Sequence, residues 1–434
     1  MAGAAIKSEI APNQLGGVEI PADWRIVELG EIAAVSSGGS APQGDHYFGG
    51  PNRFVRVQHL QESTAAVVGW DGITSAAVKR YGLKLYPKGT ILLPKSGASI
   101  RLEKRARLPF DAYVVSHLCA ILPDTRQVDP DYLFHLLRRV LFAESKAEGY
   151  PTLRLSEIRE RAIPLPPLAE QRRIARVLNS IQRTSEAQDG VLAATRELKR
   201  SLMSHLFTYG PLPPRQAAAV TLAETELGQI NGSWPLLRCE KVCEVITVGV
   251  VVRPASHYVE AGIPAFRSFN IREDRLNTKD LVYFSKEDSD GPLSKSALRS
   301  GDVLIVRTGY PGTSCIVPPE FDGANCIDLV IARPKRRVIL SEYLSRFFNS
   351  TAGRAQALSA KTGLAQQHLN VGAVKRTLIP VPPLDIQAQV VRQMAAVDAK
   401  ICGEECSRAA LETLFQSMLH HLMTGKTRVN ELEP

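Results

Sequence analysis

The sequence has few cysteines, and none at the spacing of a zinc site. Seven cysteines, an odd number, are scattered through 434 residues, which argues against a disulfide framework. Cys239 with Cys243, and Cys402 with Cys406, have the i, i+4 spacing of a helix rather than the C-x-x-C of a metal site. We therefore expect free thiols in a reducing compartment and no bound metal.

Long apolar runs are also missing. The first twenty residues have no apolar signal core, and no apolar run is long enough to cross a bilayer. We expect no membrane segment and a cytoplasmic location.

No catalytic or cofactor-binding motif is complete. H-E-x-x-H, G-x-S-x-G and helicase motifs are absent. Residues 425–427 (Gly-Lys-Thr) resemble the end of a phosphate-binding loop, but the first glycine of that loop would fall at His420. Residues 165–168 and 381–384 share only two prolines with the Asn/Asp-Pro-Pro-aromatic motif of amino methyltransferases. We expect no catalytic residue and no cofactor site in this chain.

The most informative feature that is present is a repeat. Residues 163–171 read Ile-Pro-Leu-Pro-Pro-Leu-Ala-Glu-Gln, and residues 379–387 read Ile-Pro-Val-Pro-Pro-Leu-Asp-Ile-Gln. The offset, 379 − 163 = 216, continues without a gap to Leu206 and Leu422. A unit of this length indicates a duplicated domain, because solenoid repeats are roughly 20–50 residues long.

Each copy predicts a long helix that follows two prolines, which are tolerated at a helix start. Apolar residues then recur every three and four positions, as in a coiled-coil seam. The seam positions are Ile174, Leu178, Ile181, Ser185, Gln188, Leu192, Thr195, Lys199, Leu202 and Leu206, and Val390, Met394, Val397, Ile401, Glu404, Arg408, Leu411, Phe415, Met418 and Leu422. Both seams are polar in the middle. Solvation would explain this, but we favour antiparallel pairing, in which the two polar centres face each other and fix the register.

The segments before the two helices share a mixed α/β pattern with short strands that glycine and proline interrupt. Trp234 corresponds to Trp24, 266–270 to 55–59, 301–305 to 89–93, and 343–344 to 132–133. We predict an α+β fold in which two mixed α/β domains are each followed by a long helix, with the helices pairing as an antiparallel coiled coil with pseudo-two-fold symmetry. The predicted segments are a lead-in (1–19), a first domain (20–162), a central helix (163–209), a Pro- and Ala-rich linker (210–232), a second domain (233–378), a distal helix (379–429) and a tail (430–434).

The chain resembles the DNA-specificity (S) subunits of Type I restriction–modification systems over essentially its full length. Residues 163–171 are similar to the opening of the family's central helical region, and 424–429 (Thr-Gly-Lys-Thr-Arg-Val) to the close of its distal one. Residues 226–234 are similar to the start of the second target-recognition domain. Ile386 departs from the family, which has Glu before the glutamine.

The resemblance implies a non-catalytic subunit whose two target-recognition domains each read half of a bipartite site in double-stranded DNA. The helices would act as a ruler and would dock two methyltransferase subunits, which two restriction/translocase subunits can join. S-adenosylmethionine, ATP and magnesium would then belong to the partner subunits. The net charge of +9 and the pI of about 9.2 suit an anionic partner.

Candidate DNA contacts follow from side-chain chemistry, because Arg, Asn and Gln can bind base edges while Lys and Arg bind phosphates. The candidates for base contacts, where a strand passes into a loop, are Arg56, Gln58, His59, Arg267, Ser268 and Asn270. The candidates for phosphate contacts are Lys95, Arg101, Lys104, Arg105, Arg107, Arg307 and Lys361, with Gln366 in the loop that follows. A solvated surface charge is an equally good explanation for any one of them.

Three alternatives remain open at this stage. The chain could serve a methyltransferase-only system, or be a coiled-coil adaptor without DNA specificity, or be an enzyme with unrecognised motifs. Binding of S-adenosylmethionine by the pure chain would favour the enzyme, and DNA binding that does not depend on salt, or no DNA binding at all, would favour the adaptor.

Overall fold

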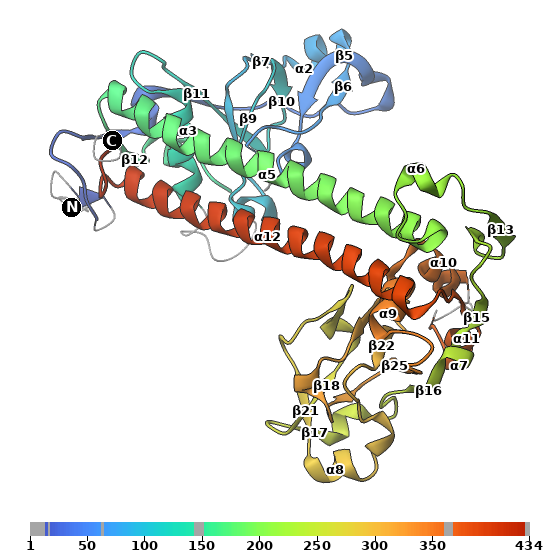
Figure 1. Cartoon of the computed structure of the whole chain (residues 1–434). Helices are drawn as coiled ribbons and strands as arrows, with labels where there is room; N and C mark the ends of the chain where they lie inside the picture. Colours follow the sequence, from blue (N-terminus) through green and yellow to red (C-terminus); the bar gives the residue numbers. More distant parts are fainter. Residues whose placement is uncertain (1–13, 16–17, 62–64, 143–151, 360–367, 430–434) are drawn as a thin grey trace. The chain divides into compact units, whose positions relative to one another are not determined.

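The computed structural model describes residues 14–15, 18–61, 65–142, 152–359 and 368–429. The chain forms two compact units, residues 1–189 with 406–434 and residues 190–405. Both unit boundaries fall inside the two long helices, α5 (Leu168–Tyr209) and α12 (Leu384–Met423), drawn green and red in Figure 1. Each unit therefore contains one α/β domain and about half of each long helix. All seven cysteines lie in the described part and are free, as expected.

Within its described residues, the first domain contains two four-stranded sheets and a two-stranded ribbon, and a short antiparallel pair of β1 and β2 precedes them. The strand orders are β6-β5-β10-β7 and β4-β11-β8-β9, with β12 against β3. The strands are β1 (Gln14–Leu15), β2 (Val18–Glu19), β3 (Arg25–Glu28), β4 (Ala33–Ser37), β5 (Phe48–Val55), β6 (Asp71–Ile73), β7 (Leu85–Tyr86), β8 (Ile91–Pro94), β9 (Ala106–Arg107), β10 (Ala112–Val114), β11 (Leu118–Pro123) and β12 (Ala162–Leu165). The helices and 3-10 turns are α1 (Leu29–Ile32), η1 (Asp45–Tyr47), η2 (Val57–His59), α2 (Ser75–Tyr81), η3 (Ala98–Leu102), α3 (Pro130–Arg139) and α4 (Leu155–Arg159).

The second domain repeats this plan. Its strand orders are β17-β21-β18-β24 and β16-β25-β22-β23, with β15 against β26. The strands are β15 (Leu236–Arg238), β16 (Cys243–Val248), β17 (Tyr258–Val259), β18 (Ile263–Phe266), β19 (Ile271–Arg272), β20 (Arg275–Leu276), β21 (Val282–Phe284), β22 (Val303–Val306), β23 (Ser314–Ile316), β24 (Asn325–Cys326), β25 (Leu329–Pro334) and β26 (Leu378–Pro380). The helices and 3-10 turns are α7 (Cys239–Val242), η4 (Pro254–His257), η5 (Ser268–Asn270), α8 (Lys286–Asp290), η6 (Ser294–Ser296), η7 (Pro319–Phe321), α9 (Ser341–Asn349), α10 (Thr351–Ser359) and α11 (Val371–Arg376).

Register identifies matching strands in the two domains. In the first, β5 and β10 run parallel, and Phe54 lies opposite Tyr113. In the second, β18 and β24 run parallel, and Ala265 lies opposite Asn325. The other strand pairs of these sheets are antiparallel. The duplication predicted from the sequence is therefore present in the hydrogen-bonding pattern as well.

One helix of each domain, α3 in the first and α9 in the second, carries a buried tyrosine that hydrogen-bonds to the strand before the long helix. Asp129 caps α3, because its side chain accepts hydrogen bonds from the Asp131 and Tyr132 amides, and proline occupies the first helical turn. The Tyr132 hydroxyl donates to the Pro164 carbonyl at 2.9 Å, and the Tyr343 hydroxyl donates to the Pro380 carbonyl at the same distance. The predicted equivalence of these tyrosines is confirmed.

The long helices pair in antiparallel fashion within each unit. In the first, Ile174 and Leu178, from the start of α5, share a core with Phe415 and Leu422, from the end of α12. Further along, Asp189 accepts a hydrogen bond from Arg408. Residue numbers thus rise on one helix as they fall on the other.

The same order holds in the second unit. Met203 and Phe207 of α5 share a core with Val390 and Met394, near the start of α12. Arg196 donates to Glu405 at 2.8 Å. The apolar ends of both predicted seams are buried, and the middle of each helix carries ion pairs, so the antiparallel prediction is confirmed.

Two boundaries differ from the prediction. The Ile-Pro segments that were assigned to the helices are the strands β12 and β26, and Ile163 and Ile379 are fully buried in the domain cores. The predicted linker contains α6 (Pro214–Ala217) and a hairpin of β13 (Leu222–Thr225) and β14 (Gly228–Asn231). Strand β12 exists because β3, far away in sequence, pairs with it.

A buried glutamine ties each long helix to its domain. The Gln171 side chain accepts a hydrogen bond from the Asp129 amide at 2.8 Å and donates to the Pro166 carbonyl at 2.8 Å. Gln387 accepts from the Leu340 amide at 2.9 Å and donates to the Pro382 carbonyl at 2.8 Å. The two glutamines are 387 − 171 = 216 residues apart, the spacing of the repeat.

Replacing either glutamine by alanine should loosen one unit and leave the other unchanged. The substitution leaves buried backbone groups without hydrogen-bond partners, which lowers the free energy of unfolding by about 1–3 kcal/mol. Hydrogen exchange followed by mass spectrometry should show faster exchange around β12 for Gln171→Ala and around β26 for Gln387→Ala. The exposed neighbours give matched controls, Arg172→Ala and Arg392→Ala. Equal loosening of both units by either glutamine variant would contradict this assignment.

Candidate nucleic-acid interface

A 3-10 turn follows the same strand in both domains and carries the predicted base-contacting residues. In the first domain the Arg56 amide donates to His59 Nδ1 at 3.0 Å. In the second the Arg267 amide donates to Asn270 Oδ1 at 2.9 Å. Because 267 − 56 = 211 and 270 − 59 = 211, the two turns occupy the same place in the repeat.

His59 braces the first turn instead of pointing at solvent. It is 9% exposed, and burial lowers its pKa, so the ring is neutral at neutral pH. Its Nδ1 accepts the Arg56 amide, which places the ring proton on Nε2, 3.7 Å from Asp71 Oδ1. Arg56 Nε lies 2.6 Å from Asp71 Oδ2, with the guanidinium 5.3 Å from the centre of the Phe48 ring.

Asn270 has the same role in the second turn. Its side chain is fully buried and donates to the Asn277 and Lys279 carbonyls, both at 2.9 Å. Arg267 donates to the Asp280 carbonyl at 2.5 Å. A base contact by His59 or Asn270 stays a prediction, but their contacts give them a structural role.

The residues that the two turns present outward are Gln58 and Phe269. Both are exposed and lie one position before the bracing residue. Phe269 was not predicted, because an aromatic residue beside a strand is typical of a core. The signal that could have found it is its alignment with the polar Gln58.

A second loop lies beside each turn. It begins at Lys95 in the first domain and at Arg307 in the second, directly after β8 and β22. The Leu153 amide donates to the Lys95 carbonyl at 2.8 Å, and the Leu369 amide to the Arg307 carbonyl at 3.0 Å. Arg307 also forms an ion pair with Asp328.

Backbone hydrogen bonds bring loop and turn to one edge of the domain. The Val115 amide donates to the Val55 carbonyl at 3.0 Å, and the Lys95 amide donates to the His117 carbonyl at 2.9 Å. The segment 115–117 thus lies between Arg56 and Lys95. We call this edge, with residues 56–59 and 95–98 in the first domain and 267–270 and 307–310 in the second, the reading edge.

Two grooves open at the reading edge of the second domain. One, of about 470 Å³, is lined by Arg267, Ser268, Phe269, Asp280, Ile327 and Asp328. The other, of about 500 Å³, is lined by Ser268, Phe269, Ile271, Arg272, Glu273, Val306, Thr308, Gly309, Tyr310, Thr313 and Arg354. The predicted residues Arg267 and Ser268 therefore lie on a concave surface.

The predicted basic loop, residues 101–107, does not form one cationic surface. Arg101 is exposed and Lys104 is half-buried. Arg105 is 7% exposed, pairs with Glu103, and donates to the Val140 carbonyl at 3.2 Å. Burial lowers the pKa of Arg105.

Arg107 likewise points toward α3, where it pairs with Asp131 and lies 4.6 Å from the centre of the Phe134 ring. Burial lowers its pKa too. Arg105 and Arg107 are thus bound to Glu103, Val140 and Asp131 of their own domain, and they are not part of an exposed cationic surface. Lys361 and Gln366 lie outside the described residues.

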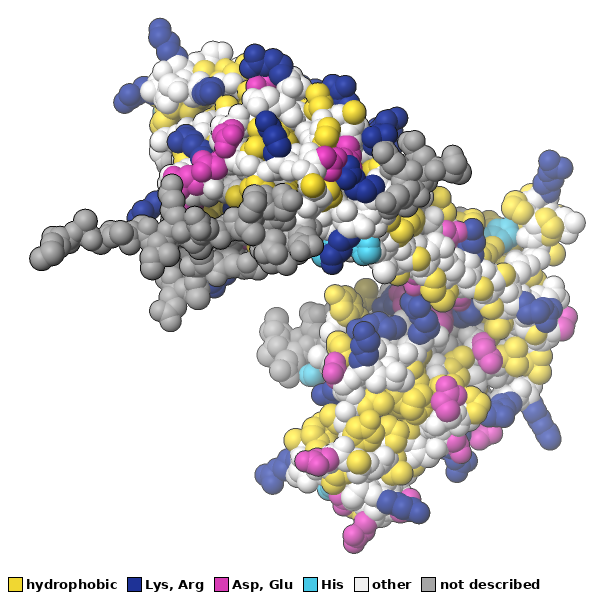
Figure 2. Space-filling model, turned by 90° about the vertical axis from the view of Figure 1, so that its left-hand side faces the viewer, with side chains coloured by type: hydrophobic (Ala, Val, Ile, Leu, Met, Phe, Trp, Pro, Cys, Tyr) yellow, Lys and Arg dark blue, Asp and Glu magenta, His cyan; other side chains and the backbone are white. Residues whose placement is uncertain are grey.

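On the face shown in Figure 2, Lys and Arg side chains are dispersed among carboxylates, and the second unit carries a broad hydrophobic area. The large hydrophobic side chains that are most exposed in that unit include Tyr310 at 82%, Val252 at 75% and Phe269 at 50%. Trp70 of the first domain is 47% exposed, and Arg53 lies 5.2 Å from its ring centre.

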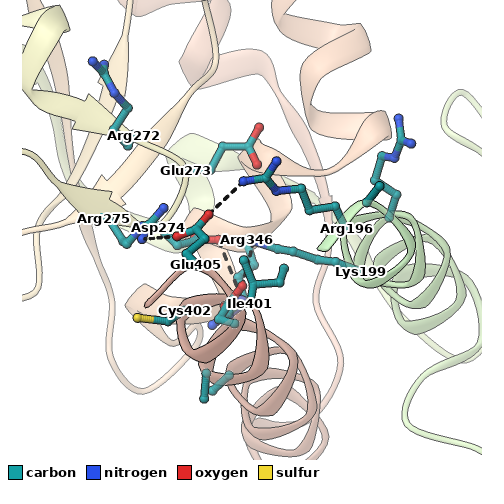
Figure 3. Close-up of a pocket in the computed structure, with 15 residues that line it drawn as sticks. Arg196, Lys199, Arg272, Glu273, Asp274, Arg275, Arg346, Ile401, Cys402 and Glu405 are labelled. Atoms are coloured by element: carbon teal, nitrogen blue, oxygen red, sulfur yellow. Dashed lines mark hydrogen bonds and ion pairs between the residues drawn. The ribbon is translucent and has the colours of Figure 1, made fainter. Parts of the chain in front are cut away.

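A larger pocket of about 960 Å³ lies in the second unit among β19, β20, α9 and the two long helices (Figure 3). Three of its charged residues pair with each other: Lys199 Nζ lies 2.7 Å from Asp398 Oδ1, and Arg346 Nη1 lies 2.8 Å from Asp398 Oδ2. Burial raises the pKa of Asp274, although Arg346 and Lys199 oppose this shift. These ion pairs form a network that connects α9 of the domain to the two long helices.

The described residues contain no group of three or more His, Cys, Asp or Glu side chains that could hold a metal ion.

Comparison with known proteins gives consistent results. A family model described as the Type I restriction modification DNA specificity domain matches residues 21–194. The Type I restriction enzyme MjaVIII specificity subunit of Methanocaldococcus jannaschii is 22% identical over 433 residues, covering 97% of this chain and 96% of the relative.

Two solved structures have a similar fold. A chain from a structure of the type I R-M system aligns with a TM-score of 0.60 and 18% identity, covering 94% of this chain and 100% of that chain. The Type I restriction-modification S subunit from M. genitalium aligns with a TM-score of 0.55 and 15% identity, covering 95% and 99%. In sequence the chain is therefore similar to the DNA-specificity subunits of Type I restriction–modification systems over nearly its full length, and in fold it is similar to the two solved structures.

Proposed function

We propose that this chain recognises a bipartite DNA target, with one half of the target read by each domain, and performs no catalysis itself. The observation that carries the proposal is the repeated reading edge. Two backbone hydrogen bonds at this edge have counterparts in both domains: Leu153 to Lys95 matches Leu369 to Arg307, and Val115 to Val55 matches Ile327 to Phe266. Different side chains occupy its exposed positions, for example Gln58 in the first domain and Phe269 in the second. One scaffold with two surfaces suits a target with two different halves.

The long helices set the distance between the halves in this proposal. They are continuous over 42 and 40 residues, which corresponds to roughly 60 Å each. Domains that read the same side of a duplex require half-site centres about one helical turn, or 10 bp, apart. A stiff helix pair supports such a spacing, because ion pairs and apolar contacts along both ends keep it from sliding.

The partners would be two methyltransferase subunits, which two restriction/translocase subunits can join. Exposed apolar side chains on the helices support docking there: Val191 is 44% exposed, Leu198 57% and Leu414 46%. Val191 and Leu198 are seven residues apart and therefore share a helix face. S-adenosylmethionine, ATP and magnesium would bind to these partners and not to this chain.

Methylome sequencing of cells with and without this gene, both carrying its methyltransferase partner, tests the proposal. The expected result is a methylated motif of two short sequences separated by a fixed spacer, present only when this gene is intact. The isolated chain, incubated with DNA, magnesium, ATP and S-adenosylmethionine, should show no turnover. A continuous motif, or catalysis that follows this chain through purification, would contradict the proposal.

Exposed and buried arginines of the first domain should behave differently when replaced. Arg101→Ala should weaken binding of the assembled complex to all DNA sequences alike and reduce the slope of log K against log salt by about 0.9, the value for one phosphate contact. Its melting temperature should not change. Arg105→Ala removes buried contacts to Glu103 and Val140 and should lower the melting temperature.

Titrations at several salt concentrations and scanning calorimetry on both variants separate these effects. Arg126→Ala, which removes another exposed arginine of the same domain, is the matched control. A lowered melting temperature for Arg101→Ala, or an unchanged one for Arg105→Ala, would mean that the roles have been assigned wrongly.

A further inference from the structure

The two reading edges differ in chemistry at two matched positions. One is the exposed residue of the 3-10 turn, where Gln58 corresponds to Phe269 at the offset of 211. The other is the tip of the loop that follows β8 or β22. Both positions are polar or small in the first domain and aromatic in the second.

The second match follows from strand register. Pro94, the last residue of β8, lies opposite Leu118 of β11, and Val306, the last residue of β22, lies opposite Leu329 of β25. Pro94 and Val306 therefore match, and the loop residues that follow them are offset by 306 − 94 = 212. Gly97 and Gly309 then coincide, and both have a positive φ, 81° and 86°. The next residues are Ala98 in the first domain and Tyr310 in the second.

Phe269 and Tyr310 line one groove of about 500 Å³ and are both exposed, at 50% and 82%. Arg272 lies beside them, with its guanidinium 5.1 Å from the centre of the Phe269 ring. Figure 3 shows that the Arg272 side chain points away from the ion-pair network behind it. The groove thus presents two aromatic rings, and the charged residues Arg272, Glu273 and Arg354 also line it.

The loop that carries Tyr310 is firmly held. The Gly312 amide donates to the Val306 carbonyl at 3.0 Å, and Thr313 Oγ1 donates to the Tyr310 carbonyl at 2.8 Å. Arg354 donates to Thr313 Oγ1 at 2.8 Å. An exposed aromatic ring on a braced loop can contact a partner with little loss of conformational entropy.

The chemistry of base edges limits what such a groove can recognise. A phenylalanine ring neither donates nor accepts a conventional hydrogen bond, and the apolar group that base pairs present in the major groove is the 5-methyl of thymine. A glutamine at the matched position of the first domain can instead bind adenine through two hydrogen bonds. The same scaffold position thus suits different bases in the two domains.

We propose that the second domain recognises at least one thymine of its half-site through the 5-methyl group, in the groove between Phe269 and Tyr310. The first domain makes no equivalent methyl contact. The proposal rests on the DNA-reading function proposed above and adds the class of base contact. It makes Phe269 and Tyr310 specificity-determining residues.

The test uses the complex assembled with its methyltransferase partner and the cognate duplex found by methylome sequencing. Thymines are replaced by uracil, which lacks only the methyl group, in one half-site at a time, and binding is measured by fluorescence anisotropy at fixed salt. One half-site should show a loss of about fourfold per contacted methyl, the equivalent of one buried methyl group. In the double variant Phe269→Gln, Tyr310→Ala that loss should disappear, so that thymine and uracil bind equally.

Both variant side chains are the ones that the first domain carries at the matched positions, and both sites are exposed, so the fold should be kept. Leu102→Ala, which removes an exposed apolar side chain that is 52% accessible in the first domain, is the matched control and should keep the loss. The proposal is overturned if the cognate site has no thymine in either half, if no half-site responds to uracil, or if the double variant still discriminates. Failure of the wild-type complex to prefer cognate over random DNA would instead refute the proposed function itself, and the methyl contact with it.

Discussion

The first domain is closed by a residue from the far end of the chain. Arg428 donates to both oxygens of Asp23, at 2.8 and 2.7 Å, and to both oxygens of Glu170, at 2.7 and 2.8 Å. Trp24 Nε1 donates to Glu170 at 3.1 Å. Glu170 is 5% exposed, and a buried carboxylate without such partners would be costly. The start of α5 and the residues after α12 must therefore meet, which forces the helices to run in opposite directions.

The second unit differs at one position of this cluster. At the repeat offset of 216, the buried Glu170 corresponds to the apolar residue Ile386. A feature common to both units is a glycine just after each helix, with φ of 89° at Gly210 and 69° at Gly425, beside the tryptophan that opens a domain. Helix α5, which follows the first domain, thus ends beside Trp234 of the second domain. Helix α12, which follows the second domain, ends beside Trp24 of the first.

Features set by local periodicity could be predicted from the sequence. The two long helices, their seams and their polar centres follow from apolar spacing, and the duplication follows from the 216-residue offset. The role of residues 162–165 could not be predicted, because they become a strand only through pairing with β3. The prolines in this segment suggested the start of a helix, whereas Ile163 lies in a strand and is fully buried.

The candidate DNA contacts were predicted by side-chain type, and type does not determine direction. Arg105 and Asn270 point inward, to partners that are remote in sequence or set by the turn. Phe269 and Tyr310 were missed because a sequence does not distinguish an exposed aromatic from a buried one. What remains from the prediction is the place of the reading edge, where Arg56, Gln58 and Lys95 of the first domain and their counterparts in the second come together.

The central claim is that the two reading edges act independently on one helix pair. A hybrid in which residues 20–167 come from a related subunit tests it most directly. This exchange takes β3 and β12, which pair with each other, from the same donor. The donor must keep the apolar residues that contact Ile174, Leu178 and Phe415, because the helices complete the core of the exchanged domain. Methylome sequencing of cells with this hybrid should show one half of the target changed, and the other half and the spacer intact. A change in both halves, or a target without two parts, would contradict the account.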